Sequence, residues 1–85
     1  MNELQTQIMR VMAEADGKSV DPSVLQRIVN KGALILDAEL AALERYDLIS
    51  YHTGGYGGRP AIYLTDPGRT FVIKAGYAPD KPLWR

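Results

Sequence analysis

After residue 48 the hydrophobic residues of this chain change from a helical to a strand-like spacing. Before that point apolar side chains recur every three or four positions, and from Ile49 onward they alternate with polar ones over short runs. The first pattern is typical of amphipathic helices and the second of half-buried strands. Because 85 residues suffice for one hydrophobic core and not for two, both parts are expected to share a single α+β domain.

Three helices are expected in the first half of the chain. The first covers residues 2–15 and ends at Asp16-Gly17, since glycine accepts a left-handed backbone at a helix end. The second starts at Asp21-Pro22, where aspartate can cap free N–H groups and proline fits the first helical position, and it runs to Asn30. The third covers residues 34–46. The residues expected to fill the core from the first and third helices include Met9, Met12, Leu36, Leu40 and Leu43.

A hairpin and a short fourth helix are expected in the second half. Residues 49–52 and 61–64 alternate between apolar and polar positions, and four glycines in the segment between them suit a long hairpin loop. Thr65-Asp66-Pro67 predicts the start of a helix that crosses residues 69–75 and closes at Gly76. Residues 77–85 contain two prolines and are expected to form an extended tail, which leaves residues 1–76 as the folded domain.

Composition excludes several classes of protein. A hydrophobic content of 46% argues against a disordered chain. The absence of cysteine excludes disulfide scaffolds and thiolate zinc sites. Apolar runs reach only about four residues, far short of the roughly 20 that span a bilayer, and the N-terminus lacks a signal-peptide pattern. We therefore expect no membrane partner and a cytoplasmic location.

Catalysis, metal binding and cofactor binding are not expected from the sequence. His52 is the single histidine, so it is the one side chain that could serve as a base beside a nucleophile. We expect His52 to be a partly exposed strand residue, which could also contact phosphate. The glycine-rich loop does not have the spacing of a phosphate-binding loop that leads into a helix. Asp37 and Glu39 are two residues apart on a helix and point in different directions.

The charges are divided unevenly along the chain. Residues 1–47 carry five basic and eight acidic residues, a net charge of −3, whereas residues 48–85 carry five basic and two acidic residues, a net charge of +3. A polyanion is therefore expected to meet the C-terminal half.

Two local motifs add to this order of elements. Residues 40–49, LAALERYDLI, are similar to the LxxLExxGLI pattern that leads from the third helix into the first wing strand of MarR and PadR regulators. Asp47 stands where those families usually have glycine, and aspartate tolerates the left-handed backbone. Residues 63–69, YLTDPGR, resemble their YxLTxxGR signature, in which Thr65 caps the following helix. Over residues 4–75 the chain thus resembles a winged helix-turn-helix domain, with three helices, a two-stranded β-hairpin wing and a short C-terminal helix.

The resemblance implies a homodimeric transcriptional regulator that binds double-stranded DNA. The third helix would enter the major groove, and the wing tip would lie against the backbone or minor groove. The residues expected to contact DNA are Arg27, Lys31, Arg45, Tyr56 and Arg59. The groove-facing positions of the third helix depart from the family pattern, because they carry aliphatic, alanine and aspartate side chains where base-reading proteins have hydrogen-bonding ones.

That departure supports an alternative, in which the domain binds a protein and does not read DNA. The expected contact residues on the third helix are Leu34, Ile35, Asp37 and Glu39. Exposed apolar clusters usually mark interfaces. The sequence leaves open whether Leu34 and Ile35 are exposed or packed beneath the wing.

Overall fold

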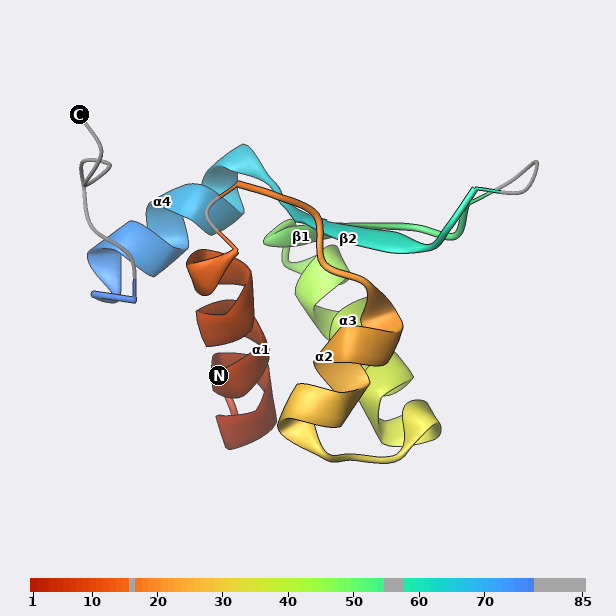
Figure 1. Ribbon diagram of the computed structural model, residues 1–85. Coiled ribbons are helices and arrows are strands. Elements are labelled where there is room, and N and C mark those ends of the chain that lie inside the picture. The colour runs from red at the N-terminus through yellow and green to blue at the C-terminus, as the bar shows by residue number, and fades with distance from the viewer. Residues whose placement is uncertain (16, 55–57, 78–85) are drawn as a thin grey trace.

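The computed structural model describes residues 1–15, 17–54 and 58–77. Within them the chain is an α+β structure of four helices and a two-stranded antiparallel sheet (Figure 1). The elements are, in order, α1 (Glu3–Glu14), α2 (Pro22–Val29), α3 (Ala33–Arg45), β1 (Ile49–His52), β2 (Ala61–Leu64) and α4 (Asp66–Lys74). The predicted contact of Tyr56 and most of the predicted tail, residues 78–85, lie outside the described residues.

Helix α1 begins with a reciprocal capping box. The Asn2 side chain accepts a hydrogen bond from the Gln5 backbone N–H at 2.7 Å, and the Gln5 side chain accepts one from the Asn2 backbone N–H at 3.3 Å. Two N–H groups that have no partner inside the helix are satisfied in this way. Beyond the helix, Gly17 has a φ of +83°, which confirms the predicted glycine stop.

Helices α2 and α3 are separated by residues 30–32. The Asp21 side chain accepts from the Ser23 N–H at 2.7 Å and caps α2, as expected. The helix ends earlier than predicted, because Asn30 itself adopts the left-handed conformation with φ 55°, which asparagine tolerates better than most residues. Helix α3 begins at Ala33, one residue before the expected start, with Gly32 as an N-cap that has no side-chain hydrogen bond.

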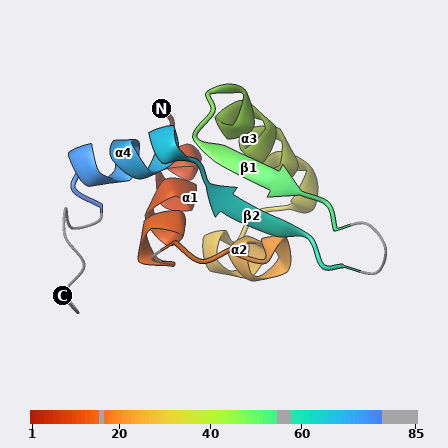
Figure 2. The same ribbon diagram turned by 90° about the horizontal axis from the view of Figure 1, so that it is seen from above.

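The hairpin follows directly from α3. Asp47 has a φ of 59°, which confirms the left-handed turn expected there, and the Leu48 N–H bonds to the Leu43 carbonyl at 3.1 Å. The strands pair in the predicted runs, with Ile49 opposite Leu64 and His52 opposite Ala61. Figure 2 shows the hairpin from above, with α3 on the side of β1 and α2 on the side of β2.

A single β-bridge ties the segment before α2 to the hairpin. The N–H and carbonyl of Val20 exchange hydrogen bonds of 2.9 Å with those of Ile62. The segment between α1 and α2 therefore runs beside β2, on the edge opposite to β1. This pairing was not predicted from the sequence.

Helix α4 starts at Asp66, within the Thr65-Asp66-Pro67 segment that the sequence predicts as its start. Thr65 caps it, because its hydroxyl accepts from the Gly68 N–H at 3.0 Å. That hydroxyl also donates to the Asp47 carbonyl, and the Thr65 N–H donates to the Leu48 carbonyl at 3.2 Å. One threonine therefore joins the start of α4 to the end of α3, and Gly76, with a φ of +81°, closes the helix as predicted.

The core lies where α1, α2, α3 and α4 meet the inner face of the hairpin. Met9 and Met12 are 0% and 1% exposed, so their predicted role as core residues is confirmed. The other fully or largely buried apolar residues are Ile8, Ala13, Val20, Leu25, Val29, Leu36, Leu40, Leu43, Ile49, Ile62 and Val72. No helix in the described part of the chain is both long and apolar enough to cross a membrane.

Candidate functional site

The outward face of α3 is apolar and acidic. Leu34 is 85% exposed and Ile35 is 55% exposed, because Leu36, Leu40 and Leu43 take the buried positions of the helix. The sequence left the exposure of this pair open, and the structure shows both side chains in solvent. Asp37, Ala38 and Ala41 are exposed on the same helix.

Helix α2 carries a second pair of exposed aliphatic side chains. Val24 is 40% exposed and Ile28 is 58% exposed, and a separation of four residues places them on one face of the helix. The helices on either side of residues 30–32 therefore both present apolar surface to solvent. The pair on α2 was not among the predicted contact residues, although the spacing of Val24 from the buried Leu25 and Val29 indicates that it lies off the core face.

Glu39 does not share the exposed position of Asp37. Its carboxylate accepts hydrogen bonds from the Asn2 side-chain amide at 2.8 Å and from the Gln5 side-chain amide at 3.0 Å. Gln5 is only 7% exposed, and Glu39 itself is half-buried. Glu39 therefore holds α3 to the start of α1, whereas Leu34, Ile35 and Asp37 of the predicted partner-contact set are exposed.

The four predicted cationic residues in the described ranges are all exposed. Arg27 is in the last turn of α2, and Lys31 lies in the turn before α3. Arg45 is in the last turn of α3, at the opposite end of that helix. Arg59 lies in the hairpin loop, two residues before β2 begins at Ala61. The structure thus distributes these cations over the α2–α3 junction, the α3–β1 junction and the hairpin loop, and does not gather them in one cluster.

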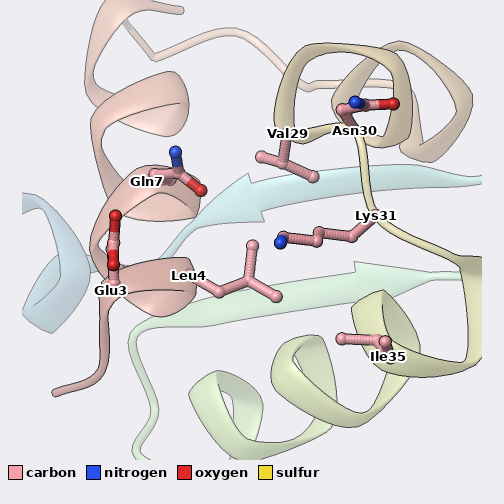
Figure 3. Close-up of a pocket in the computed structure, with 7 residues that line it drawn as sticks. All are labelled: Glu3, Leu4, Gln7, Val29, Asn30, Lys31 and Ile35. Atoms are coloured by element: carbon pink, nitrogen blue, oxygen red, sulfur yellow. The ribbon is translucent and has the colours of Figure 1, made fainter.

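A shallow hollow of about 430 Å³ lies between the start of α1, the end of α2 and the start of α3 (Figure 3). Its apolar wall is formed by Leu4, Val29 and Ile35, and its polar groups come from Glu3, Gln7, Asn30 and Lys31. In Figure 3 the Lys31 side chain extends toward α1 across this hollow. Since Ile35 belongs both to the hollow and to the exposed face of α3, the two features are continuous.

The outward face of the hairpin carries polar and aromatic side chains. Ser50 Oγ and His52 Nε2 lie 3.1 Å apart, and the rings of His52 and Tyr63 meet edge to face with their centroids 5.2 Å apart. Tyr63 is 41% exposed and His52 is exposed as well. The expected strand position of His52 agrees with the structure, whereas its contact with Tyr63 depends on the strand register and was not predicted.

The described residues contain no group of three or more His, Cys, Asp or Glu side chains that could hold a metal ion. Comparisons of the chain with protein-family models, with curated proteins and with solved structures gave no significant match.

Proposed function

We propose that this chain is a winged helix-turn-helix domain that binds double-stranded DNA as a small transcriptional regulator. The observation that carries the proposal is the order of elements, in which two helices, α2 and α3, are joined by residues 30–32 and are followed by the β1–β2 hairpin (Figures 1 and 2). A helix pair of this kind can lay its second helix in the major groove. The hairpin would then reach the neighbouring backbone or minor groove.

The surface chemistry supports binding that is dominated by phosphate contacts. Arg27, Lys31, Arg45 and Arg59 are exposed and would contact phosphates, and Tyr56, which lies outside the described residues, is the fifth proposed contact. The exposed face of α3 offers aliphatic side chains, alanines and one carboxylate, so it has few groups that can read base edges. The expected DNA binding is therefore only weakly dependent on base sequence.

The salt dependence of duplex binding tests this proposal. Each phosphate contact contributes about −0.9 to the slope of log affinity against log salt, so the four contacts of one bound protomer predict a slope of about −3.6. Affinity should then fall about 150-fold between 50 and 200 mM salt, measured by fluorescence anisotropy of a labelled mixed-sequence duplex. Absence of duplex binding at tens of micromolar protein in 50 mM salt would refute the proposed DNA binding.

A second candidate function is favoured by the exposure of Leu34, at 85%, and Ile35, at 55%. In this alternative the domain is a protein-interaction module, an inhibitor or an adaptor, and the outward face of α3 with Asp37 forms the contact. The hollow beside Ile35 would receive an aliphatic side chain of the partner. Large exposed aliphatic side chains in a small domain are typical of such interfaces.

The variant Leu34→Asp separates this alternative from DNA binding. The side chain is almost wholly in solvent, so the thermal midpoint should stay unchanged, whereas partner binding should be lost. Thr70→Asp on the exposed side of α4 is the matched control. The protein of interest is one that the native chain and the control retain from cell extract and that Leu34→Asp does not retain. It is then purified, and its affinity for the native chain is measured. Equal retention by all three chains contradicts the protein-interaction role.

A regulator of transcription would act in the cytoplasm with its DNA, and we propose that it does so as a homodimer. Two copies would contact the duplex about one helical turn apart. They would double the number of phosphate contacts, so a dimer should show a salt slope of about −7.2, twice that of one protomer. Sedimentation equilibrium of the free protein measures the mass directly. A mass of 9.4 kDa at micromolar concentrations would contradict the dimer while leaving DNA binding by a monomer open to the anisotropy test.

A further inference from the structure

The outward face of α3 carries an acidic and a basic side chain that are two turns of helix apart. Positions 34, 37, 38, 41 and 45 follow the spacing of three and four residues that places side chains on one side of a helix. These residues are Leu34, Asp37, Ala38, Ala41 and Arg45, and all five are exposed. The face therefore has an apolar middle, with a carboxylate on the side of its N-terminus and a guanidinium in its last turn.

Asp37 and Arg45 are too far apart to form an ion pair with each other within one chain. They are eight residues apart on α3, which corresponds to about 12 Å along the helix axis. Every residue of α3 that lies three or four positions from either side chain is alanine or leucine. Neither residue therefore has an opposite charge at the positions where neighbours on a helix form ion pairs.

The two charges are complementary to those of a second copy of α3 that runs in the opposite direction. If a twofold axis passes beside Ala41, residues at equal distances before and after Ala41 lie at the same level on the two helices. Asp37 is four residues before Ala41, and Arg45 is four residues after it. Asp37 of each copy then lies opposite Arg45 of the other copy, so the symmetry produces the ion pair twice.

We propose that the outward face of α3 binds a second copy of this chain, with the two helices antiparallel and Ala41 at the twofold axis. Packed helices are about 8 to 10 Å apart, depending on the side chains at the contact. Ala38 and Ala41 are small, so the two backbones can approach closely and the long arginine side chain can reach the carboxylate. Leu34, which is 85% exposed in the single chain, packs against the far end of α3 in the second copy.

This association goes beyond the proposed DNA binding, because it uses the face of α3 that would enter the major groove. A chain that is paired through this face cannot lay the same helix in the groove at the same time. The proposed DNA-bound homodimer would therefore have to pair through another surface. Association through α3 and duplex binding through α3 exclude each other.

Charge reversal with rescue tests the interface, with sedimentation equilibrium in 50 mM salt as the measurement. Asp37→Arg and Arg45→Asp each place like charges opposite each other twice, so the dissociation constant of the dimer should rise at least about tenfold. The double variant restores opposite charges with the two sides exchanged and should return the dissociation constant close to the native value. Glu14→Arg on α1 and Arg27→Asp on α2 make the same charge changes at exposed positions away from this face, and they should leave it unchanged.

Each outcome supports or overturns the interface. Weaker association in both single variants with recovery in the double variant supports it. Loss without recovery in the double variant overturns the antiparallel pairing. A dimer that is equally stable in the native chain and in the single variants overturns the interface and leaves a homodimer through another surface.

A native chain that stays at 9.4 kDa up to hundreds of micromolar overturns both the association through α3 and the proposed homodimer. Duplex binding by a monomer is then decided by the anisotropy test alone. Because all the substituted positions are exposed, the variants should fold, and circular dichroism melting of each variant checks that they do.

Discussion

At the scale of single residues, two acidic side chains on α3 have different environments. Glu39 accepts hydrogen bonds from Asn2 and Gln5, whereas Asp37, two positions earlier, is exposed. We predict that Glu39→Ala lowers the free energy of unfolding by about 1 to 3 kcal/mol, because the amide of the buried Gln5 loses its acceptor. Asp37→Ala should change it by less than about 0.5 kcal/mol. Urea unfolding of the two variants measures the difference, and equal effects would contradict the assigned role of Glu39.

Gly68 is required for a close approach of two backbone segments. A Cβ atom at this position would lie 1.9 Å from the Leu48 carbonyl oxygen and 3.2 Å from a methyl group of Leu64. Gly68→Ala must therefore move α4 away from the start of the hairpin, and we expect a loss of about 3 kcal/mol, at the upper end of typical overpacking costs. The measurement is again urea unfolding. A loss below about 1 kcal/mol would mean that α4 can shift without disturbing the Leu48 backbone.

At the scale of elements, the helices and strands were predictable because their signals are local. Each signal lies within a few residues of the helix end that it marks. The signals are Asp21 before a proline, Thr65 three residues before a glycine, and Gly17 and Gly76 after apolar stripes. The start of α4 at Asp66 agrees with the Thr65-Asp66-Pro67 signal, because threonine caps the helix and proline can occupy its first turn.

The contacts between elements were less accessible to sequence reasoning. The bridge from Val20 to Ile62 and the hydrogen bond from Gln5 to Glu39 join residues more than thirty positions apart. No local pattern marks such partners, because the pairing depends on how the helices pack around the core. The exposure of Leu34 was left open for the same reason, since its environment depends on whether the hairpin covers the start of α3.

Helix α3 is the element with an incomplete N-terminus, and this yields a stability prediction. Gly32 is its N-cap, has an ordinary φ of −64° and makes no side-chain hydrogen bond, and a Cβ atom there would meet nothing within 4 Å. Gly32→Ser should supply an acceptor for the free N–H groups of the first turn and reduce the entropy of the unfolded chain. We expect a gain of about 0.5 to 1 kcal/mol, seen as a higher thermal midpoint. An unchanged or lower midpoint would contradict the capping argument.

At the scale of the whole molecule, the proposed DNA-binding mode requires the hairpin loop and α3 to contact the same duplex. Arg59→Ala should weaken binding to all duplex sequences about equally and flatten the salt slope by about 0.9, from about −3.6 to about −2.7. Anisotropy titrations on two duplexes of unrelated sequence measure both effects. A selective loss on one sequence would mean that Arg59 contacts base edges, and an unchanged slope would exclude it from phosphate contact.

The orientation of α3 on the duplex can be tested by reversing one charge. Asp37 is exposed on the face that would enter the groove, where a carboxylate is repelled by phosphates and a lysine would be attracted. Asp37→Lys should therefore raise duplex affinity and steepen the salt slope by about 0.9. Glu14→Lys makes the same charge change at the exposed end of α1, and at physiological salt a charge beyond about 8 Å from the duplex is largely screened. An increase confined to Asp37→Lys supports α3 against the DNA. Equal increases in duplex affinity for the two variants would reflect net charge alone. No increase in either variant would mean that the outward face of α3 points away from the duplex and remains free for a protein partner.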